Sequence, residues 1–353
     1  MKKQNEIQIM RGMLILMVVT QHVLSIFGGE INYLLARLLY CVDVEMFFVI
    51  SGMLYYSKIN KYQSDGFFRF ILKKTNELII PYLFWTTLLD LIIYVGLSIP
   101  SIGTVLSGMG FRKHNIISYA INMILFRDCY IETLWFVYVL YICFFFYHIL
   151  LVLHKKVELI LCCVTTISIV IQCNIDIYIV EKVFTGLIAF GSGCIIAKYR
   201  DHIENMLSTY RRVLNIIALM SFFLCFSVER SNVIPDSSFF LVAFRTMSVV
   251  VYTVTSYIII NSVIVYIPYG STLWNLLFKY GNISYAIYLT HNPYIIYPAW
   301  IISITLIPNA LIAEVVALIL SYFVCLIGGT MVCMLNIGKY VIGQKELLRI
   351  GRR

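Results

Sequence analysis

Apolar runs of close to twenty residues recur along the chain, with short polar segments between them. A helix needs about 20 consecutive apolar residues to cross the hydrocarbon core of a bilayer. The pattern therefore predicts an all-α fold, a polytopic membrane helix bundle of about ten transmembrane helices, with ends placed to within about two to four residues. The predicted spans are Gln8–Phe27, Leu38–Ser57, Leu78–Ser98, Leu134–Leu153, Val157–Cys173, Val180–Ala197, Val213–Val228, Phe239–Val263, Tyr280–Trp300 and Asn309–Leu335.

The first apolar run also has features of a secretory signal, because Lys2, Lys3 and Arg11 precede it. Many further spans follow, so we predict a retained first helix. The loops between the predicted spans are too short to form a separate folded unit, and no internal repeat is present. We therefore expect a single integral membrane domain over residues 1–353.

Composition supports a membrane protein. Of the 353 residues, 61% are hydrophobic and 13% are charged, whereas about a quarter of a typical soluble chain is charged. The ten cysteines form no CxxC pair and no Cys/His pattern with the spacing of zinc sites. We interpret them as small apolar side chains, and we predict no metal site.

The net charge of +9 follows the predicted topology. With the N-terminus inside, twenty Lys and Arg residues fall on the inner side of the spans and seven on the outer side. Cytoplasmic loops of membrane proteins carry such an excess of basic residues. Both termini are therefore predicted to be cytoplasmic, and we expect no nucleic-acid partner.

Two ionisable residues in the first span lie on one helical face. The eleven residues from Arg11 to His22 rise about 16 Å and complete three turns plus about 20°. This spacing puts Arg11 near the cytoplasmic surface and His22 near the middle of the bilayer, where ionisable groups usually face a protein interior or a water-filled cavity. The alternatives are a topology-setting charge for Arg11 and a packing histidine for His22.

Further polar residues approach the same depth from other spans. Asp43, Glu45 and Ser51 lie in the second span, and the alternative for the two carboxylates is a pair solvated at the outer interface. His291 lies about 18 Å of helix beyond Lys279, at a depth close to that of His22. Pro293 is expected to loosen the backbone there. Two imidazoles and nearby carboxylates indicate proton-transfer chemistry, although a packing role for His291 stays open.

Five motifs occur in a fixed order along the chain: an arginine and a histidine separated by ten residues, then "MFFVISGMLYY", "IIPYLFW", "TLWFVYVLY" and "ISYAIYLTHNPY". In this order the chain resembles the acyltransferase-3 family of membrane-bound O-acyltransferases. The resemblance implies about ten spans and transfer of an acyl group from cytoplasmic acyl-coenzyme A to a hydroxyl. It implies functional roles for Arg11, His22, Ser51, Gly52, Trp135 and His291.

The basic segment before Pro81 departs from the family pattern. Many relatives carry two arginines there, whereas this chain has Lys73 and Lys74, with Glu77 where a second basic residue is expected. We expect the phosphates of acyl-coenzyme A to meet Arg11, Arg69, Lys73 and Lys74 through charge-assisted hydrogen bonds.

The resemblance implies a membrane O-acyltransferase with acetyl-coenzyme A as the expected donor and no tightly bound cofactor. His22 is expected to remove the proton from the acceptor hydroxyl, with His291, Glu45 and Ser51 as further catalytic candidates; an acyl-enzyme on His22 or Ser51 stays open. The expected acceptor is a surface glycan or its lipid-linked precursor. The expected location is the cell membrane of a bacterium, as a multi-pass protein in contact with membrane lipid and glycan-assembly proteins.

Other interpretations stay open at this point. The same composition suits a glycan exporter or flippase, although the two related halves of such transporters are not found. It also suits a non-catalytic component of a glycan-assembly complex. For Ser51–Gly52 the alternative is close helix packing, and for Trp135 an interfacial aromatic anchor.

Overall fold

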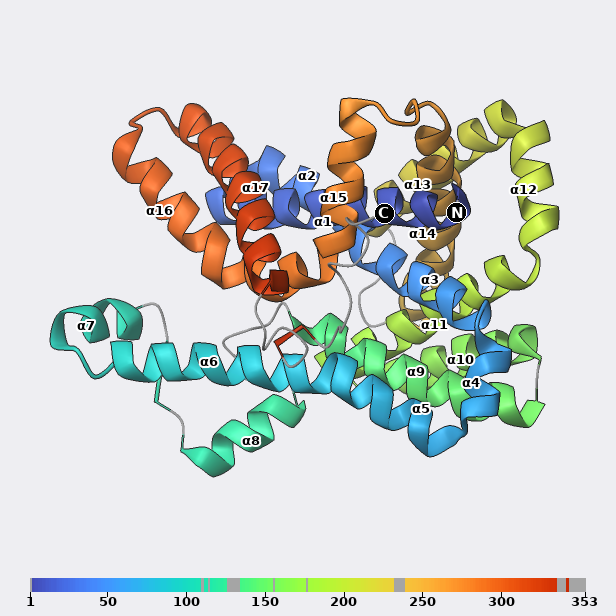
Figure 1. Ribbon diagram of the computed structural model, residues 1–353, viewed down its shortest axis with the longest axis horizontal. Coiled ribbons are helices and arrows are strands. Elements are labelled where there is room, and N and C mark those ends of the chain that lie inside the picture. The colour runs from blue at the N-terminus through green and yellow to red at the C-terminus, as the bar shows by residue number, and fades with distance from the viewer. Residues whose placement is uncertain are drawn as a thin grey trace.

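The computed structural model describes residues 2–108, 111–113, 115–125, 134–154, 156–175, 177–231, 239–334 and 341–342. Over these residues the chain is helical (Figure 1). Some of the basic residues counted for the topology lie outside the described residues: Arg127, Lys155, and those from Lys339 to Arg353. The predicted end of the last span, Leu335, lies outside them as well.

The helices follow one another in this order: α1 (Lys2–Phe27), α2 (Glu30–Tyr40), α3 (Asp43–Tyr56), α4 (Ile59–Asp65), α5 (Phe67–Lys74), η1 (Thr75–Ile79), α6 (Ile80–Gly96), α7 (Pro100–Gly108), α8 (Ile116–Leu125), α9 (Trp135–His154), α10 (Val157–Gln172), α11 (Tyr178–Lys198), α12 (Arg200–Thr209), α13 (Arg211–Arg230), α14 (Phe239–Val265), α15 (Thr272–Thr290), η3 (His291–Ile295), α16 (Ile296–Leu306) and α17 (Ala310–Met334). The elements η1 and η3 are single turns of π-helix.

Seven helical segments among the described residues are long and apolar enough to cross a membrane. They are Asn5–Phe27, Phe67–Gly96, Trp135–Leu153, Tyr178–Lys198, Arg211–Arg230, Phe239–Val265 and Ala310–Met334. Each overlaps one of the predicted spans, although Phe67–Gly96 begins eleven residues before the predicted start at Leu78. The protein is therefore a polytopic, multi-pass membrane bundle, as the sequence predicts.

The other three predicted spans coincide with shorter or interrupted helices. The span Leu38–Ser57 is divided between the end of α2 and the 14-residue helix α3, and the span Val157–Cys173 corresponds to the 16-residue helix α10. The span Tyr280–Trp300 is interrupted at Asn292, whose backbone is extended (φ −127°, ψ 126°). The next residue is Pro293, which cannot donate a backbone hydrogen bond, so the expected loosening of this helix is confirmed.

Residues 30–40 form a separate helix, α2, that the hydropathy pattern did not predict. Gly28 and Gly29 separate it from α1 with φ angles of 70° and 91°. Glycine reaches this left-handed region without a steric penalty, so the chain turns sharply at the end of the first span. The Asp43 carboxylate then accepts a hydrogen bond from the Val44 backbone N–H (2.6 Å) at the start of α3.

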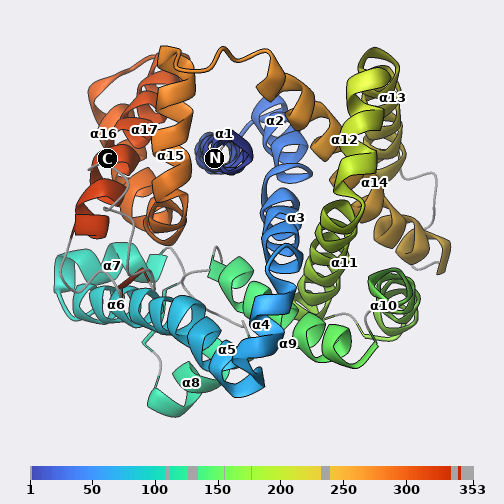
Figure 2. The ribbon, with the colours of Figure 1, turned by 45° about the vertical axis from the view of Figure 1, so that its right-hand side comes forward.

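Helix α1 lies between α15 and α3 (Figure 2). The contact with α15 is a backbone approach at Gly12 and Gly281: a Cβ on Gly12 would overlap the carbonyl oxygen of Leu277, and one on Gly281 would overlap that of Gln8. Small residues allow such close helix crossings in membranes. This contact fixes the first span, with Arg11 and His22, against the helix that leads to His291.

A second backbone approach joins α3 to α11. A Cβ on Gly52 would overlap the carbonyl oxygen of Phe190, and one on Gly193 would overlap that of Val49. Gly52 therefore has the packing role that the sequence left open. Its neighbour Ser51 is held at a fixed place beside this crossing.

We expect Gly52→Ala to destabilise the protein, because the added methyl group must displace the backbone of α11. Overpacking of this kind costs about 1–3 kcal/mol. Thermal unfolding of the detergent-solubilised protein measures the effect. Gly108→Ala is the matched control, since a Cβ there has no neighbour within 4 Å among the described residues; equal melting temperatures for the two variants would contradict the packing role.

Candidate active site

The two predicted intramembrane histidines lie side by side. The ring centroids of His22, on α1, and His291, in η3, are 5.1 Å apart, and the ring planes are inclined by 54°. Asn292 adds a third polar group, with its Nδ2 3.4 Å from His22 Nδ1. The amide nitrogen is a donor, so His22 Nδ1 accepts in this arrangement. Sequence analysis did not single out Asn292, although it directly follows His291.

His291 is completely buried, whereas His22 is half-buried. His291 Nδ1 lies 2.8 Å from the backbone carbonyl of Tyr288. A carbonyl only accepts hydrogen bonds, so Nδ1 carries the proton and Nε2 is left as the acceptor nitrogen. That Nε2 is buried and has no hydrogen-bond partner among the residues the structure describes. His22 is therefore the more accessible of the two rings.

A cavity of about 350 Å³, which we call the inner cavity, brings Arg11, Ser51, Lys73 and Lys74 together. Its lining also includes the charged residues Lys58 and Glu77, and the apolar or aromatic residues Phe47, Phe136, Leu140, Phe144 and Tyr288. The lining therefore contains four basic side chains and one carboxylate. Such an excess of positive charge in a cleft attracts anions.

Glu77 reduces the free charge of this cavity. Its carboxylate accepts a hydrogen bond from Lys74 Nζ (2.8 Å) and lies 3.8 Å from Lys73 Nζ. Lys74 is mostly buried and its ammonium lies 4.2 Å from the centre of the Phe144 ring. Arg69 is exposed on α5 and is absent from the described lining of the inner cavity. Of the predicted donor-binding residues, Arg11, Lys73 and Lys74 are therefore gathered and Arg69 is not.

A larger cavity of about 680 Å³, the outer cavity, is lined by Gln21 of α1 and Glu45 of α3. Its charged lining residues are Arg37, Glu45, Glu181, Lys182, Glu229 and Arg245, three basic and three acidic. Tyrosines and hydroxyl side chains complete the wall, among them Tyr33, Tyr40, Tyr252, Ser25, Ser168 and Thr246. The charges of this wall therefore balance, and apolar residues such as Ile175, Ile188 and Val249 complete the lining.

The two carboxylates of the second span are buried, so the interpretation as a pair solvated at the outer interface is wrong. Asp43 is 0% exposed and Glu45 is 8% exposed. One oxygen of each, Asp43 Oδ2 and Glu45 Oε2, has no hydrogen-bond partner within the described ranges. Glu45 therefore offers a free acceptor atom beside the outer cavity.

Lys182 lies near the start of the predicted span Val180–Ala197, where a charge is ordinarily solvated, but its side chain is buried and lines the outer cavity. Its Nζ donates to the Tyr40 hydroxyl (2.8 Å) and lies 5.5 Å from the centre of the Trp135 ring. Trp135 is itself buried, so the interpretation as an interfacial anchor is wrong. The position of Lys182 near the start of a span gave no signal of this burial.

The two cavities lie at different levels of the same helices. On α1, Arg11 lines the inner cavity and Gln21 the outer one, ten residues or about 15 Å of helix apart. His22 directly follows Gln21. On the other side, Tyr288 lines the inner cavity and its ring centroid lies 5.5 Å from that of His291. Neither histidine is among the described lining of either cavity, but each lies beside a lining residue: His22 follows Gln21 on α1, and His291 contacts the Tyr288 ring.

A family model described as "Acyltransferase domain" matches residues 4–335. The chain belongs to the acyltransferase 3 family. This match confirms the resemblance seen in the motifs and identifies the protein as an O-acyltransferase, which uses an acyl donor and an acceptor. Neither the curated proteins nor the solved structures give a match to this acyltransferase. Family membership favours an enzyme over the exporter and over the non-catalytic component.

Proposed function

We propose that this acyltransferase moves an acetyl group from cytoplasmic acetyl-coenzyme A to a hydroxyl of a surface glycan or its lipid-linked precursor. The observation that carries the proposal is the pair His22–His291, with each ring beside a residue that lines a cavity. The proposal includes ten spans in one membrane domain over residues 1–353, both termini in the cytoplasm and a location in the bacterial plasma membrane.

The inner cavity suits the donor. Acyl-coenzyme A combines several phosphate charges with a long uncharged arm, and Arg11, Lys58, Lys73 and Lys74 offer charge-assisted hydrogen bonds to phosphate. The phosphates bind at this basic end, with Arg69 available at the surface of α5. The pantetheine arm then runs among the apolar side chains and carries the thioester toward the histidines.

The outer cavity suits an acceptor rich in hydroxyl groups. Sugar hydroxyls both donate and accept hydrogen bonds, and the wall supplies carboxylates, hydroxyls, an amide and ammonium or guanidinium groups. Glu45 Oε2, buried and without a partner in the described structure, accepts a hydrogen bond from one such hydroxyl. Gln21, in the wall of this cavity, directly precedes His22 on α1.

The chemical step is acyl transfer with His22 as general base. His22 acts through Nδ1, the nitrogen that the Asn292 amide keeps unprotonated, and the acceptor hydroxyl takes the place of that amide. Nδ1 removes the hydroxyl proton as the acceptor oxygen attacks the thioester carbonyl; the carbon–sulfur bond then breaks and the thiolate of coenzyme A takes up a proton. A positioned base contributes about 10²–10⁴-fold in rate. His291 supports the His22 ring from behind, and Ser51, whose hydroxyl donates to the Phe47 carbonyl (2.8 Å), contacts the donor.

We expect His22→Ala to lower acetyl transfer by about 10²–10⁴-fold. Purified protein with radiolabelled acetyl-coenzyme A, together with acetyl groups on the cell-surface polysaccharide of the native host, measures the loss. His202→Ala, at an exposed position on α12, is the matched control. Normal acetylation by a normally produced His22→Ala protein removes His22 from the reaction. A wild-type protein with no turnover but with glycan transport supports the exporter instead.

Arg11→Lys keeps the topology-setting charge but removes the bidentate guanidinium. We expect the KM for acetyl-coenzyme A to rise about tenfold with little change in kcat, which is the loss of roughly one charge-assisted hydrogen bond. Arg212→Lys, at an exposed position on α13, controls for a general effect of the substitution. An unchanged KM shows that the charge of Arg11 only sets the orientation of the protein in the membrane.

Asn292→Leu removes the amide that contacts His22 Nδ1. One lost hydrogen bond costs about 0.5–1.5 kcal/mol, so we expect kcat to fall by about two- to tenfold at an unchanged KM for the donor. The control is Asn275→Leu, on the exposed surface of the same helix bundle where the amide contacts Gly270. Equal kinetics of the two variants argue against a role for Asn292.

A further inference from the structure

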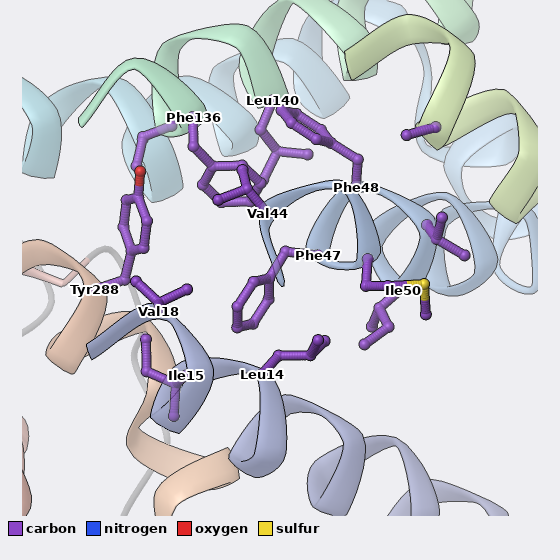
Figure 3. Packing of buried hydrophobic residues seen from close by; sticks show 14 of the residues in the cluster. Leu14, Ile15, Val18, Val44, Phe47, Phe48, Ile50, Phe136, Leu140 and Tyr288 are labelled. Atoms are coloured by element: carbon purple, nitrogen blue, oxygen red, sulfur yellow. The ribbon is translucent and has the colours of Figure 1, made fainter. Parts of the chain in front are cut away.

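Three aromatic side chains form a continuous wall within the lining of the inner cavity. The ring centroids of Phe47 and Phe136 are 6.0 Å apart, and those of Phe136 and Tyr288 are 5.1 Å apart. All three side chains are buried. Figure 3 shows them facing one another from α3, α9 and α15, with the Tyr288 hydroxyl directed toward Phe136. We call these three residues the aromatic wall.

The aromatic wall closes the end of the cavity that lies away from the basic residues. On α9, Phe144 lies under the ammonium of Lys74, and Phe136 is eight residues, or about 12 Å of helix, further on. On α3 the cavity residues run from Leu54, which is four residues before Lys58 in the sequence, to Phe47. Helices α9 and α3 thus each lead from the basic end of the cavity to one member of the wall.

The histidine pair lies directly behind the aromatic wall. The Tyr288 ring centroid is 5.5 Å from that of His291, and the Tyr288 backbone carbonyl accepts the hydrogen bond from His291 Nδ1. His22, on α1, lies beside His291, with the ring centroids 5.1 Å apart. A donor that enters from the basic end therefore meets the wall last, immediately before the proposed base.

We propose that the aromatic wall limits the acyl group to a short chain, with Phe136 as its main specificity-determining residue. The inference rests on the proposed function. With the phosphates held at the basic end, the acyl group is the part of the donor that reaches the wall. Its carbonyl faces Tyr288 and the histidines, and its alkyl tail meets Phe47 and Phe136. A single methylene in such an apolar pocket changes kcat/KM by about 10- to 200-fold.

The test compares acetyl-, butyryl- and hexanoyl-coenzyme A as donors for the wild-type protein and for Phe136→Ala, with kcat/KM measured for each. We expect the wild type to prefer acetyl over butyryl by about tenfold or more. In Phe136→Ala that ratio falls at least about tenfold, because the space of the lost ring accommodates the longer chain. Phe136→Leu, which keeps the site apolar, is the second variant and shifts the ratio in the same direction by less.

Phe144→Ala is the matched control, because it removes the same side chain from the same helix and the same cavity at the opposite end. It is expected to raise the KM of all three donors alike, through the loss of the ring under Lys74, and to leave their ratio at the wild-type value. This separates acyl-chain selection from a general loss of donor binding.

Several results overturn the inference without touching the proposed function. A wild type that uses the three donors equally well has no length limit at the wall, and an unchanged ratio in both Phe136 variants places the limit elsewhere. A ratio shifted equally in Phe144→Ala also contradicts it. A wild-type protein that turns over no acyl-coenzyme A of any length contradicts the proposed function itself.

Discussion

Backbone contact between α1 and α15 determines where the two histidines meet. The helices touch at Gly12 and Gly281, where the carbonyl oxygens of Leu277 and Gln8 occupy the space of the missing side chains. Each histidine follows its glycine by ten residues, His22 on α1 and His291 at the start of η3, directly after α15. Lipid tails provide no hydrophobic driving force between helices, so close van der Waals contact carries much of the association. If the two helices were a few ångströms further apart at these glycines, the rings of His22 and His291 would no longer be in contact.

The interruption after Thr290 is the second constraint. A continuous helix would use the Tyr288 carbonyl for its own hydrogen-bond ladder, whereas here that carbonyl accepts from His291 Nδ1. Pro293 cannot donate, and Asn292 is extended, so backbone acceptors near the site are free for side chains. The same break directs the Asn292 amide toward His22. The polar network of the site therefore originates from one irregular turn.

Part of this arrangement could be predicted from the sequence. The rise of 1.5 Å per residue placed His22 and His291 at one depth, and Pro293 marked the break. Hydropathy located the seven longest apolar helical segments. Hydropathy did not separate α2 from α3, because the residues before and after the break between these helices are both apolar. Nor did it show the turn at Gly28–Gly29, which depends on backbone angles.

Burial was harder to predict than depth. Asp43, Glu45 and Lys182 lie near the ends of spans, where a charge is ordinarily solvated, yet all three are buried. Their burial depends on which helices cover them, and that is decided by packing between distant segments. Asn292 was missed for a related reason: its partner His22 is 270 residues away along the chain. A periodicity argument treats one helix at a time and cannot pair such residues.

The first two turns of α3 separate the two cavities. Glu45 lines the outer cavity and Phe47 the inner one, only two residues apart. In the proposed reaction the thioester lies in the inner cavity, and exclusion of water from such a reactive group is one purpose of a closed site. The Gly52–Gly193 crossing holds α3 against α11 by backbone contact. The segment of α3 between the two cavities is therefore held in place by a contact that side-chain motion cannot loosen. In the proposed reaction, loosening of that crossing would therefore favour transfer of the acyl group to water over transfer to the acceptor.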